Sequence, residues 1–545
     1  MEGLHAGRSA GRKCAGGRLY YDKEESIVMK KSMSLLLAGS LSVTALAGCT
    51  QTAPPASGGN TAGESGGTTD SGSLKPQTFT FLDNSHPSWP YSKDALVWKL
   101  LQEKTGVTLD VQIPSGSVAD ALSMTIASGN MPDLMYTPDK KLADKYGQQG
   151  ALVNILDYAN DMPNFKKWMA QYPAETQNAL ASDGKMYIFP NQGIGETNRM
   201  HWLYREDIFK KLGLSQPQTW DELYAALKKI KEAYPSSYPF SWRAGTDSAI
   251  LYLRNFAPAF QTGWDYYYDF DKKEWRYGPT EDNFKKMIVY LNKFYKEGLI
   301  PPDFLTVDTK QWQDLMSTER SFVSVDYIGR IDFFNTALRQ ANPSYNLAFM
   351  ATPAGWDGAP RLNAYTQFLE SGLMVASTSK KIKDVMKYID FFYSEEGRTL
   401  ASWGKEGTTF KTENGKKQFI EPYADVADLR KKTGLSTDGT YIWFDYDSHL
   451  SLASPELKLA YAEAPKYDSQ MQPRPSFTAE ETEMLSTVGD AINKKRDENL
   501  SKFIMGTRSL DEWPKYVEDM KKLGTDKIVG VYKAAYDRSL KASQK

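Results

Sequence analysis

The chain has little of what metal, disulfide and thiol-based catalytic sites require. Its 2 cysteines, Cys14 and Cys49, both precede residue 78, where strand and helix patterns begin. A disulfide framework, a zinc site built on cysteine and a cysteine nucleophile are therefore excluded from the globular part. The 4 histidines are scattered without H-E-x-x-H or a similar ligand spacing. We accordingly predict no metal, no cofactor and no catalytic residues.

Charge of one sign and long apolar runs are also missing. The formal net charge is -1 over 545 residues, so no basic field points to nucleic acid. The one apolar stretch near the start, residues 35–46, is broken by serine, glycine and threonine and is shorter than the roughly 20 residues that span a bilayer. No Walker A pattern occurs, so the chain is not expected to be an ATPase. The length excludes one small domain and favours two large ones.

Aromatic residues are plentiful by contrast. They make up 13% of the chain, with 13 Trp and 32 Tyr, although a mean hydropathy of -0.53 is that of a polar, soluble protein. Such rings either fill a core or form a stacking surface for a ligand. Core packing is the commoner role at any single position.

The first 77 residues carry a signal rather than a fold. Lys30 and Lys31 precede the apolar stretch 35–46, and "LAGC" at 46–49 supplies small residues before a cysteine, which is the order of a secretory signal peptide. "LAGC" resembles the lipobox of bacterial lipoproteins, which implies cleavage before Cys49 and acylation of its thiol. Two or more acyl chains on one residue suffice for stable membrane anchoring. A permanent transmembrane helix is the weaker alternative.

The segments on either side of this signal have no helix or strand pattern. Residues 1–28 place charged sequence ahead of the signal, and we expect translation to begin at Met29, with 1–28 an over-extended leader. Residues 49–77 are rich in Gly, Ser, Thr and Pro and cannot bury enough apolar surface to fold. The prediction is a signal peptide at 29–48, a flexible linker at 49–77 and a folded part at 78–545.

Strands and helices alternate in the folded part. "TFTFL" (78–82), "VTLDVQI" (107–113) and "PDLMY" (132–136) predict strands, with helices between them at 93–105 and 117–129. Such alternation predicts crossovers and a largely parallel sheet. Further strands are expected at 183–190, at 201–207, from 321 and within 362–377.

Capping signals mark the later helices. Thr219 and Glu222 form a capping box before a helix to 232, and Ser509 and Glu512 repeat the device near the C-terminus. Helices are also expected at 282–297 and 380–393. Asp269, Asp271 and Glu274 in "DFDKKEW" could suggest calcium, but the adjacent Lys272 and Lys273 favour an ordinary hairpin tip.

Several segments, in this order, resemble the bacterial extracellular solute-binding proteins that feed ATP-driven importers, especially the large lipoprotein subgroup associated with oligosaccharide uptake. They are "SGNMPDLMY" (128–136), "DGKMYIFP" (183–190), "YREDIFKKLGLSQPQTWDELYAALKKI" (204–230), "YLNKFYKEGLIPPDF" (290–304), "YSEEGRTLASWGKEGTTF" (393–410) and "FIMGTRSLDEWPKYVEDMKKLG" (503–524).

The resemblance implies an α/β fold of type II, with two discontinuous lobes that hinge around a ligand cleft. The chain is expected to leave lobe 1 near Pro190, to return at 364–371 and to cross again at 397–409. Lobe 1 would then hold about 78–190 plus 371–400, and lobe 2 about 191–363 plus much of 410–545. Many members carry an acidic calcium loop after the helix that corresponds to 219–232. Here that place reads "AYPSSYPFSWRAG" (233–245), without a carboxylate, so no metal is predicted there.

A carbohydrate site needs flat aromatic rings and planar polar groups. The candidate binding residues are aromatic and polar residues in or beside a predicted loop or an expected crossing. The stacking candidates are Trp89, Trp202, Tyr327, Trp356, Tyr365, Trp403 and Trp443, and the polar candidates are Asp83, Asn84, Arg205, Arg243, Asp247, Asp326, Arg330, Asn363 and Glu406. Arg205 and Arg243 would also suit the carboxylate of a uronic acid.

The resemblance implies a monomeric receptor that is lipid-anchored at Cys49 on the extracellular face of the cell membrane. It would bind an oligosaccharide, uronic-acid chains included, close around it and deliver it to the permease subunits of an ABC transporter. Two alternatives stay open: a surface-anchored glycoside hydrolase, which would add two carboxylates at the scissile bond, and a carbohydrate receptor without a role in transport.

Overall fold

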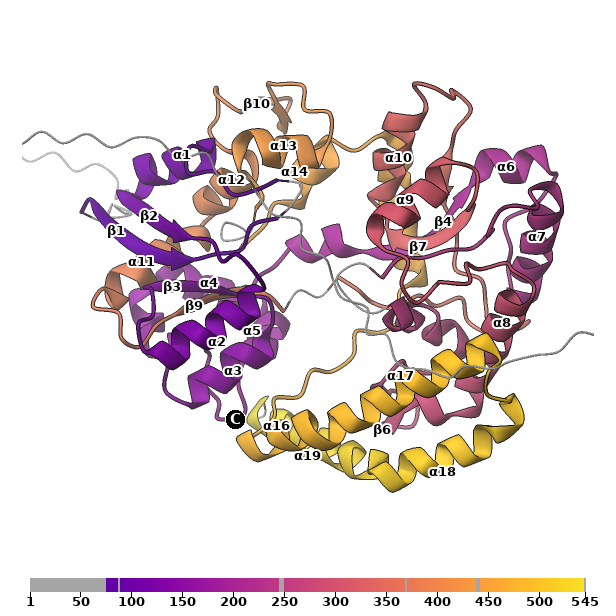
Figure 1. Cartoon of the computed structure of the whole chain (residues 1–545). Helices are drawn as coiled ribbons and strands as arrows, with labels where there is room; N and C mark the ends of the chain where they lie inside the picture. The colour runs from indigo at the N-terminus through magenta and orange to yellow at the C-terminus, as the bar shows by residue number, and fades with distance from the viewer. Residues whose placement is uncertain (1–74, 87–88, 245–248, 368–369, 438–441, 544–545) are drawn as a thin grey trace, which may run out of the picture. The chain divides into compact units, whose positions relative to one another are not determined.

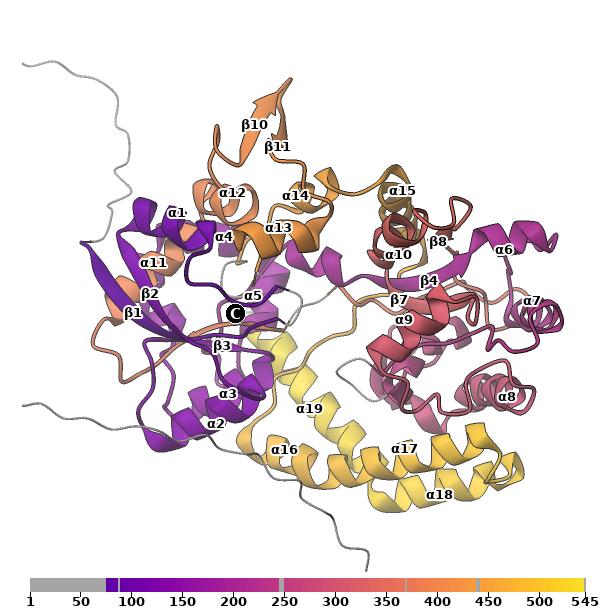
Figure 2. The same ribbon diagram turned by 45° about the horizontal axis from the view of Figure 1, so that its top comes forward.

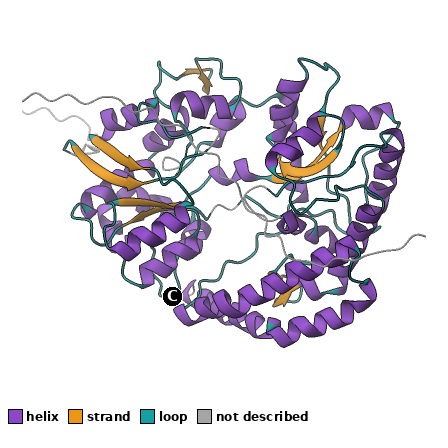
Figure 3. Ribbon diagram, viewed as in Figure 1, coloured by secondary structure: helices purple, strands orange, loops and turns teal. Residues whose placement is uncertain are grey.

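The fold is built from many helices around two small β-sheets and two hairpins (Figure 3). A computed structural model of the chain describes residues 75–86, 89–244, 249–367, 370–437 and 442–543. The predicted leader, signal peptide, Cys49, nearly all of the predicted linker, and Asp247 lie outside the described residues. Residues 71–545 form one compact unit.

The strands are short and fall into separate groups. They are β1 (Gln77–Leu82), β2 (Val107–Gln112), β3 (Leu134–Thr137), β4 (Met200–Arg205), β5 (Tyr266–Asp269), β6 (Glu274–Tyr277), β7 (Val323–Tyr327), β8 (Leu347–Phe349), β9 (Gly372–Val375), β10 (Phe410–Glu413) and β11 (Lys416–Phe419).

The α-helices supply most of the ordered structure. They are α1 (Leu96–Thr105), α2 (Val118–Ser128), α3 (Lys140–Gln148), α4 (Pro163–Gln171), α5 (Pro173–Ala179), α6 (Glu206–Lys211), α7 (Trp220–Ala233), α8 (Asp282–Lys296), α9 (Thr309–Ser317), α10 (Arg330–Leu338), α11 (Ile382–Phe392), α12 (Glu395–Trp403), α13 (Val426–Thr433), α14 (Tyr446–Ser451), α15 (Pro455–Glu463), α16 (Ala479–Met484), α17 (Asp490–Met505), α18 (Trp513–Leu523) and α19 (Thr525–Ser543). Among the helices that the structure describes, none is both long and apolar enough to cross a bilayer.

The first sheet has the order β2-β1-β3-β9 and is covered on both faces (Figure 1). β1 pairs in parallel with β2 and β3, whereas β9 returns from far along the chain and pairs antiparallel with β3. Successive side chains of a strand point to opposite faces. Phe79 and Phe81 therefore pack in the core under α1, α4 and α11, while Leu82 packs in a second cluster with α2 and α3.

The second sheet has the order β7-β4-β8, and both of its pairings are antiparallel. The predicted parallel sheet is therefore right for β1 to β3 and wrong here, because these strands are separated by long excursions that leave their direction open. Alternation along β4 places Met200, Trp202 and Tyr204 in the largest core cluster. Leu203 points to the opposite face and packs in another cluster.

The helix ends of the structure agree closely with the signals in the sequence. The strands agree less well with their predictions. Gly106 ends α1 with a φ of 75°, a left-handed conformation that favours glycine. The Thr219 hydroxyl caps α7 by accepting the Glu222 N–H, but the Glu222 carboxylate accepts from the Gln218 N–H, so only half of the expected capping box forms. The strand expected at 183–190 is absent from that described stretch, which holds a turn and one isolated bridge.

Segments that run between the two sheets lie in hydrogen-bonded pairs. The Gln192 N–H donates to the Ile442 carbonyl, and the Phe444 N–H donates back to the Gln192 carbonyl. In the second pair, the Asn363 N–H donates to the Tyr467 carbonyl and the Ser469 N–H donates to the Asn363 carbonyl. We call residues 360–366 and 467–474 the crossing segments.

The third crossing differs from the one expected at 397–409. Trp403 at the end of α12 packs on Phe410 and Phe419 of the hairpin β10–β11, which projects beyond α12 and α14 (Figure 2). Leu429 and Trp443 belong to the same core cluster as Phe79 and Phe81. Residues 410–437 and 442–443 thus lie with the first sheet rather than with the second, because apolar side chains such as Leu429 and Trp443 pack in its core.

Candidate functional site

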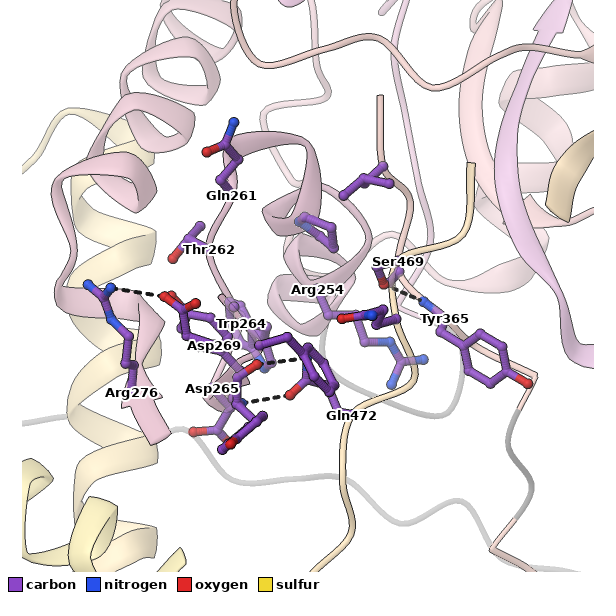
Figure 4. Close-up of a pocket in the computed structure, with 18 of the residues that line it drawn as sticks. Arg254, Gln261, Thr262, Trp264, Asp265, Asp269, Arg276, Tyr365, Ser469 and Gln472 are labelled. Atoms are coloured by element: carbon purple, nitrogen blue, oxygen red, sulfur yellow. Dashed lines mark hydrogen bonds and ion pairs between the residues drawn. The ribbon is translucent and has the colours of Figure 1, made fainter. Parts of the chain in front are cut away.

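Four cavities of the described part of the chain have volumes of about 1390, 440, 170 and 30 Å³, and the first of these four is called the largest cavity. Its walls are the 3-10 helix Ala257–Phe260, the hairpin β5–β6, the end of β7 and the two crossing segments. Figure 4 shows this cavity, with Trp264 and Asp269 on the hairpin side and Tyr365 and Ser469 on the crossing segments.

Six partly exposed aromatic residues line this cavity: Tyr266, Tyr267, Tyr268, Phe270, Tyr327 and Tyr365. Four of them lie close together on the hairpin, at 266–270. A two-stranded ribbon can bury only one of its faces, so a run of aromatic residues along it leaves some rings toward the cavity. This arrangement supplies the flat apolar surfaces on which a sugar ring can stack.

The hairpin and a crossing segment are joined into one wall by an amide side chain. The Tyr268 N–H donates to Gln472 Oε1 at 2.7 Å, and Gln472 Nε2 donates to the Tyr268 carbonyl at 3.4 Å (Figure 4). Ser469 Oγ accepts from the Tyr365 N–H at 3.1 Å. These hydrogen bonds fix the aromatic rings relative to the crossing segments.

Most charged groups of the cavity are paired. Arg276 Nη1 lies 3.2 Å from Asp269 Oδ2, and Arg276 Nε lies 2.7 Å from Glu281 Oε1. Arg199 contacts Asp468 at 2.6 Å. Burial opposes ionisation of Asp269, but the Lys272 N–H and Arg276 outweigh it and hold the pKa of that carboxyl below its usual value.

Two smaller cavities adjoin the large one and reach the first sheet's side of the molecule. One of about 170 Å³ shares Tyr365 and Met471 with it and extends to Phe189. Another of about 440 Å³ shares Asn198 and Tyr327 with it. The three together follow the region where the crossing segments run.

The 440 Å³ cavity brings aromatic and cationic groups together. His86 and Trp89 stack with ring centroids 3.6 Å apart, and the Arg430 guanidinium lies 4.7 Å from the Trp89 ring. Burial, together with the positive charges of Arg430 and Arg330, lowers the pKa of His86 to about 4. The imidazole is therefore neutral at pH 7.

The structure brings seven of the residues proposed from the sequence to these cavities or beside them. Tyr327 and Tyr365 line the largest cavity, Trp89 and Arg330 line the 440 Å³ cavity, and Asp83 and Asn84 lie beside Trp89 in a cavity of about 30 Å³. Asn363 lies in a crossing segment, where its Nδ2 donates to the Met200 carbonyl at 2.8 Å.

Three of the tryptophans proposed as stacking surfaces are core residues. Trp202 is fully buried on the inner face of β4, and Trp443 is buried in the core of the first sheet. Trp403 is buried against Phe410 and Phe419. Trp403 Nε1 donates to Asp445 at 2.9 Å. Trp356 is partly buried, with the Lys286 ammonium 4.5 Å from its ring and Phe260 beside it. These places correct the expectation that loop-proximal tryptophans line the cleft.

The proposed polar residues mostly have structural partners. Arg205 is fully buried, donates to Asp207 at 2.8 and 2.7 Å, and stacks on Tyr345 at 3.9 Å. Arg243 donates to Asp326 at 2.6 Å, and both side chains are buried. Glu406 is exposed and lies outside the lining of the largest cavity.

The sequence-based prediction missed Arg254 and four aromatic residues of the hairpin, Tyr266, Tyr267, Tyr268 and Phe270. The run "YYYDF" at 266–270 was a usable signal, because so many rings in a short hairpin exceed what one buried face accommodates. Arg254 carried no such signal, since its surroundings come from segments distant in sequence.

Comparison with known proteins decides the family. The family model for the bacterial extracellular solute-binding protein matches residues 84–399. The chain belongs to this family. Its two sheets and paired crossing segments are those of a periplasmic-binding-protein-like α/β fold, as the resemblance implied.

Curated relatives of this solute-binding protein cover most of its length. The fructooligosaccharide ABC transporter substrate-binding protein FusA of Streptococcus pneumoniae serotype 4 is 23% identical over 502 residues, which are 85% of this chain and 90% of FusA. The polygalacturonan/rhamnogalacturonan-binding protein YtcQ of Bacillus subtilis is 24% identical over 464 residues, 81% of this chain and 88% of YtcQ.

Among solved structures, the alginate-binding protein AlgQ2 without calcium ion is similar, with a TM-score of 0.69 and 24% identity. The match covers 85% of this chain and 98% of AlgQ2. At this identity the similarity establishes the fold, and the ligand has to be argued from the cavity.

Proposed function

We propose that this solute-binding protein captures an oligosaccharide in the 1390 Å³ cavity and delivers it to an ABC importer. The observation that carries the proposal is the wall of partly exposed aromatic rings that the hairpin and crossing segments hold in place. The volume exceeds the about 300–1,000 Å³ of most small-molecule pockets, which favours a ligand larger than one sugar ring. FusA and YtcQ, named for oligosaccharide and polysaccharide ligands, support the same class.

Binding would act through closure. A ligand that contacts both sides of the adjoining cavities stabilises the closed form by its differential affinity for that form. The crossing segments would form the hinge, because they are a pair of hydrogen-bonded stretches of chain that lie next to the cavity. The closed form would then dock on permease subunits in the membrane, to which a lipid on Cys49 would tether the monomeric chain on the extracellular face.

Isothermal titration of the purified protein with a panel of neutral and acidic oligosaccharides tests the proposal. Stoichiometric binding of a panel member, with a raised Tm and no product on chromatography, is expected. Release of shorter sugars would support the glycoside hydrolase instead. Failure of every oligosaccharide to bind would refute the proposal.

A pair of variants tests where the sugar lies. Phe270→Ala removes a ring that lines the cavity, and loss of one stacking contact should weaken binding roughly 3- to 10-fold. Tyr158→Ala removes a partly buried ring outside that lining and serves as the matched control. Equal affinities for the two variants would place the sugar elsewhere.

A further inference from the structure

Arg254 differs from the other arginines that line the largest cavity, because no described residue forms an ion pair with it. It lies in the 3-10 helix Ala249–Asn255, is partly buried and lines the cavity. Arg276 and Arg474 in the same lining are paired with Asp269 and Glu370, respectively. Within the part of the chain that the structure describes, Arg254 has no ion pair, and its buried Nε has no hydrogen-bond acceptor.

An unpartnered guanidinium in a partly buried place is costly unless a ligand supplies the acceptor. A guanidinium stays charged at every physiological pH, so the cost cannot be removed by loss of a proton. Figure 4 shows the Arg254 side chain extending between the hairpin and the crossing segment that carries Ser469. A planar anion in this gap can accept two parallel hydrogen bonds.

The neighbourhood of Arg254 carries a second excess of positive charge. The buried Asp326 carboxylate accepts from Arg243 Nε at 2.6 Å and from Arg330 Nε at 3.0 Å, so a single negative charge faces two positive charges. Tyr327 lines both the largest and the 440 Å³ cavities. The positive charges of Arg243, Arg254 and Arg330 all interact electrostatically with its phenol. Burial and Asp326 raise the pKa of Tyr327, and Arg243, Arg254 and Arg330 oppose that rise.

Most acidic groups of the cavity lie on the hairpin side, and Asp468 on the crossing segment is paired with Arg199 at 2.6 Å. Asp269 and Glu281 are neutralised by Arg276, while Asp271 and Asp282 are exposed. Exposed charges are screened by solvent and salt, whereas the partly buried arginines are screened less. The electrostatic potential of the cavity therefore favours an anionic ligand group on the side where Tyr327 lies.

We infer that the ligand is an acidic oligosaccharide, one of whose uronic-acid carboxylates is held by the Arg254 guanidinium beside Tyr327. This inference rests on the proposed function and narrows its ligand to sugar chains that carry carboxylates. The carboxylate supplies the acceptors that Arg254 lacks, and the sugar rings reach the aromatic residues of the hairpin.

Matched acidic and neutral sugars test the inference. The protein is titrated with oligouronides from polygalacturonate, alginate and glucuronoxylan, and with the same preparations after chemical reduction of their carboxyl groups to alcohols. At least one oligouronide should bind at least 10-fold more tightly than its reduced counterpart, with an affinity that falls as salt is added.

Variants at Arg254 locate the carboxylate. Arg254→Gln should weaken the oligouronide roughly 10- to 100-fold, the effect of removing a hydrogen-bonded charge, and should change the affinity for the reduced sugar less than about 3-fold. Arg254→Lys keeps the positive charge but lacks the planar guanidinium. Its affinity for the oligouronide should lie between those of the unaltered protein and Arg254→Gln. Arg320→Gln removes the same charge from an exposed arginine outside the lining of this cavity and should bind like the unaltered protein. Thermal melts establish that each variant is folded.

The outcomes separate the two proposals. If reduced or neutral sugars bind as well as the oligouronides, the acidic-ligand inference is overturned while oligosaccharide capture stands. Equal affinities of Arg254→Gln and Arg320→Gln for the oligouronide would overturn the role of Arg254. If neither acidic nor neutral oligosaccharides bind, the proposed function itself fails.

Discussion

Replacement of Asp326 by asparagine should destabilise the protein strongly. The Asp326 carboxylate is fully buried and accepts four hydrogen bonds: from Arg243 Nε at 2.6 Å and Nη2 at 3.3 Å, from Arg330 Nε at 3.0 Å, and from the Tyr327 N–H at 2.9 Å. Asparagine has a similar shape but no charge, and its amide N–H groups would face guanidinium donors. Removal of one partner from a buried charge network costs about 3–5 kcal/mol.

The control for this experiment is the same substitution in an exposed ion pair. Asp314 pairs with Arg320, and their side chains are 57% and 44% exposed. Asp314→Asn should therefore cost less than about 1 kcal/mol. Urea unfolding followed by tryptophan fluorescence measures both variants, since Trp312 lies 5.7 Å from the Arg243 guanidinium and reports on this region. If Asp326→Asn costs no more than Asp314→Asn, the carboxylate does not hold the two arginines as described.

Three further predictions concern pH, the crossing segments and the core. Burial lowers the pKa of His201 to about 3, below about 6.5 in an unfolded chain, so the free energy of unfolding should fall by about 1.4 kcal/mol per pH unit between pH 6 and 4 from this residue; His201→Gln should reduce that slope in urea titrations. A Cβ at Gly195 would lie 1.6 Å from the Gln367 carbonyl oxygen, so Gly195→Ala should lower Tm and sugar affinity, whereas Gly116→Ala, which meets nothing within 4 Å, should change neither. Trp202→Ala should cost about 3–5 kcal/mol of stability, and calorimetry should find an unchanged Kd in the folded fraction.

Local signals in the sequence predicted local structure well. The helix that ends at Gly106, the amphipathic face of α7 and the hairpin tip at 269–274 all follow from residues within a few positions of one another. The tip is an ordinary turn, as Lys272 and Lys273 indicated, and Asp269 accepts from the Lys272 N–H at 3.0 Å.

Long-range pairing is what the sequence could not supply. Arg243 meets Asp326 across 83 residues, so its role as a buried ion pair was invisible, whereas the partner of Arg205 stands only two residues away at Asp207. Trp202 illustrates the same limit. Its position beside a predicted crossing suggested a ligand contact, but strand alternation turned it into the core.

The prediction of the binding site was partial for a related reason. Five of the seven predicted stacking residues are tryptophans near loops, yet most aromatic residues of the cavity wall are tyrosines and a phenylalanine on one hairpin. Which surface that hairpin faces depends on the crossing segment through Gln472, about two hundred residues later in the chain. Of the proposed residues, Tyr327 and Tyr365 line the largest cavity, and their contact with a ligand stays a prediction.

A crystal structure of the protein with the oligosaccharide that binds most tightly in the panel tests the central claim most directly. We expect sugar rings between the hairpin β5–β6 and the crossing segments, stacked on the hairpin aromatics, with a carboxylate within hydrogen-bond distance of Arg254. An ordered oligosaccharide bound outside this cavity would refute both the proposed site and the role of Arg254.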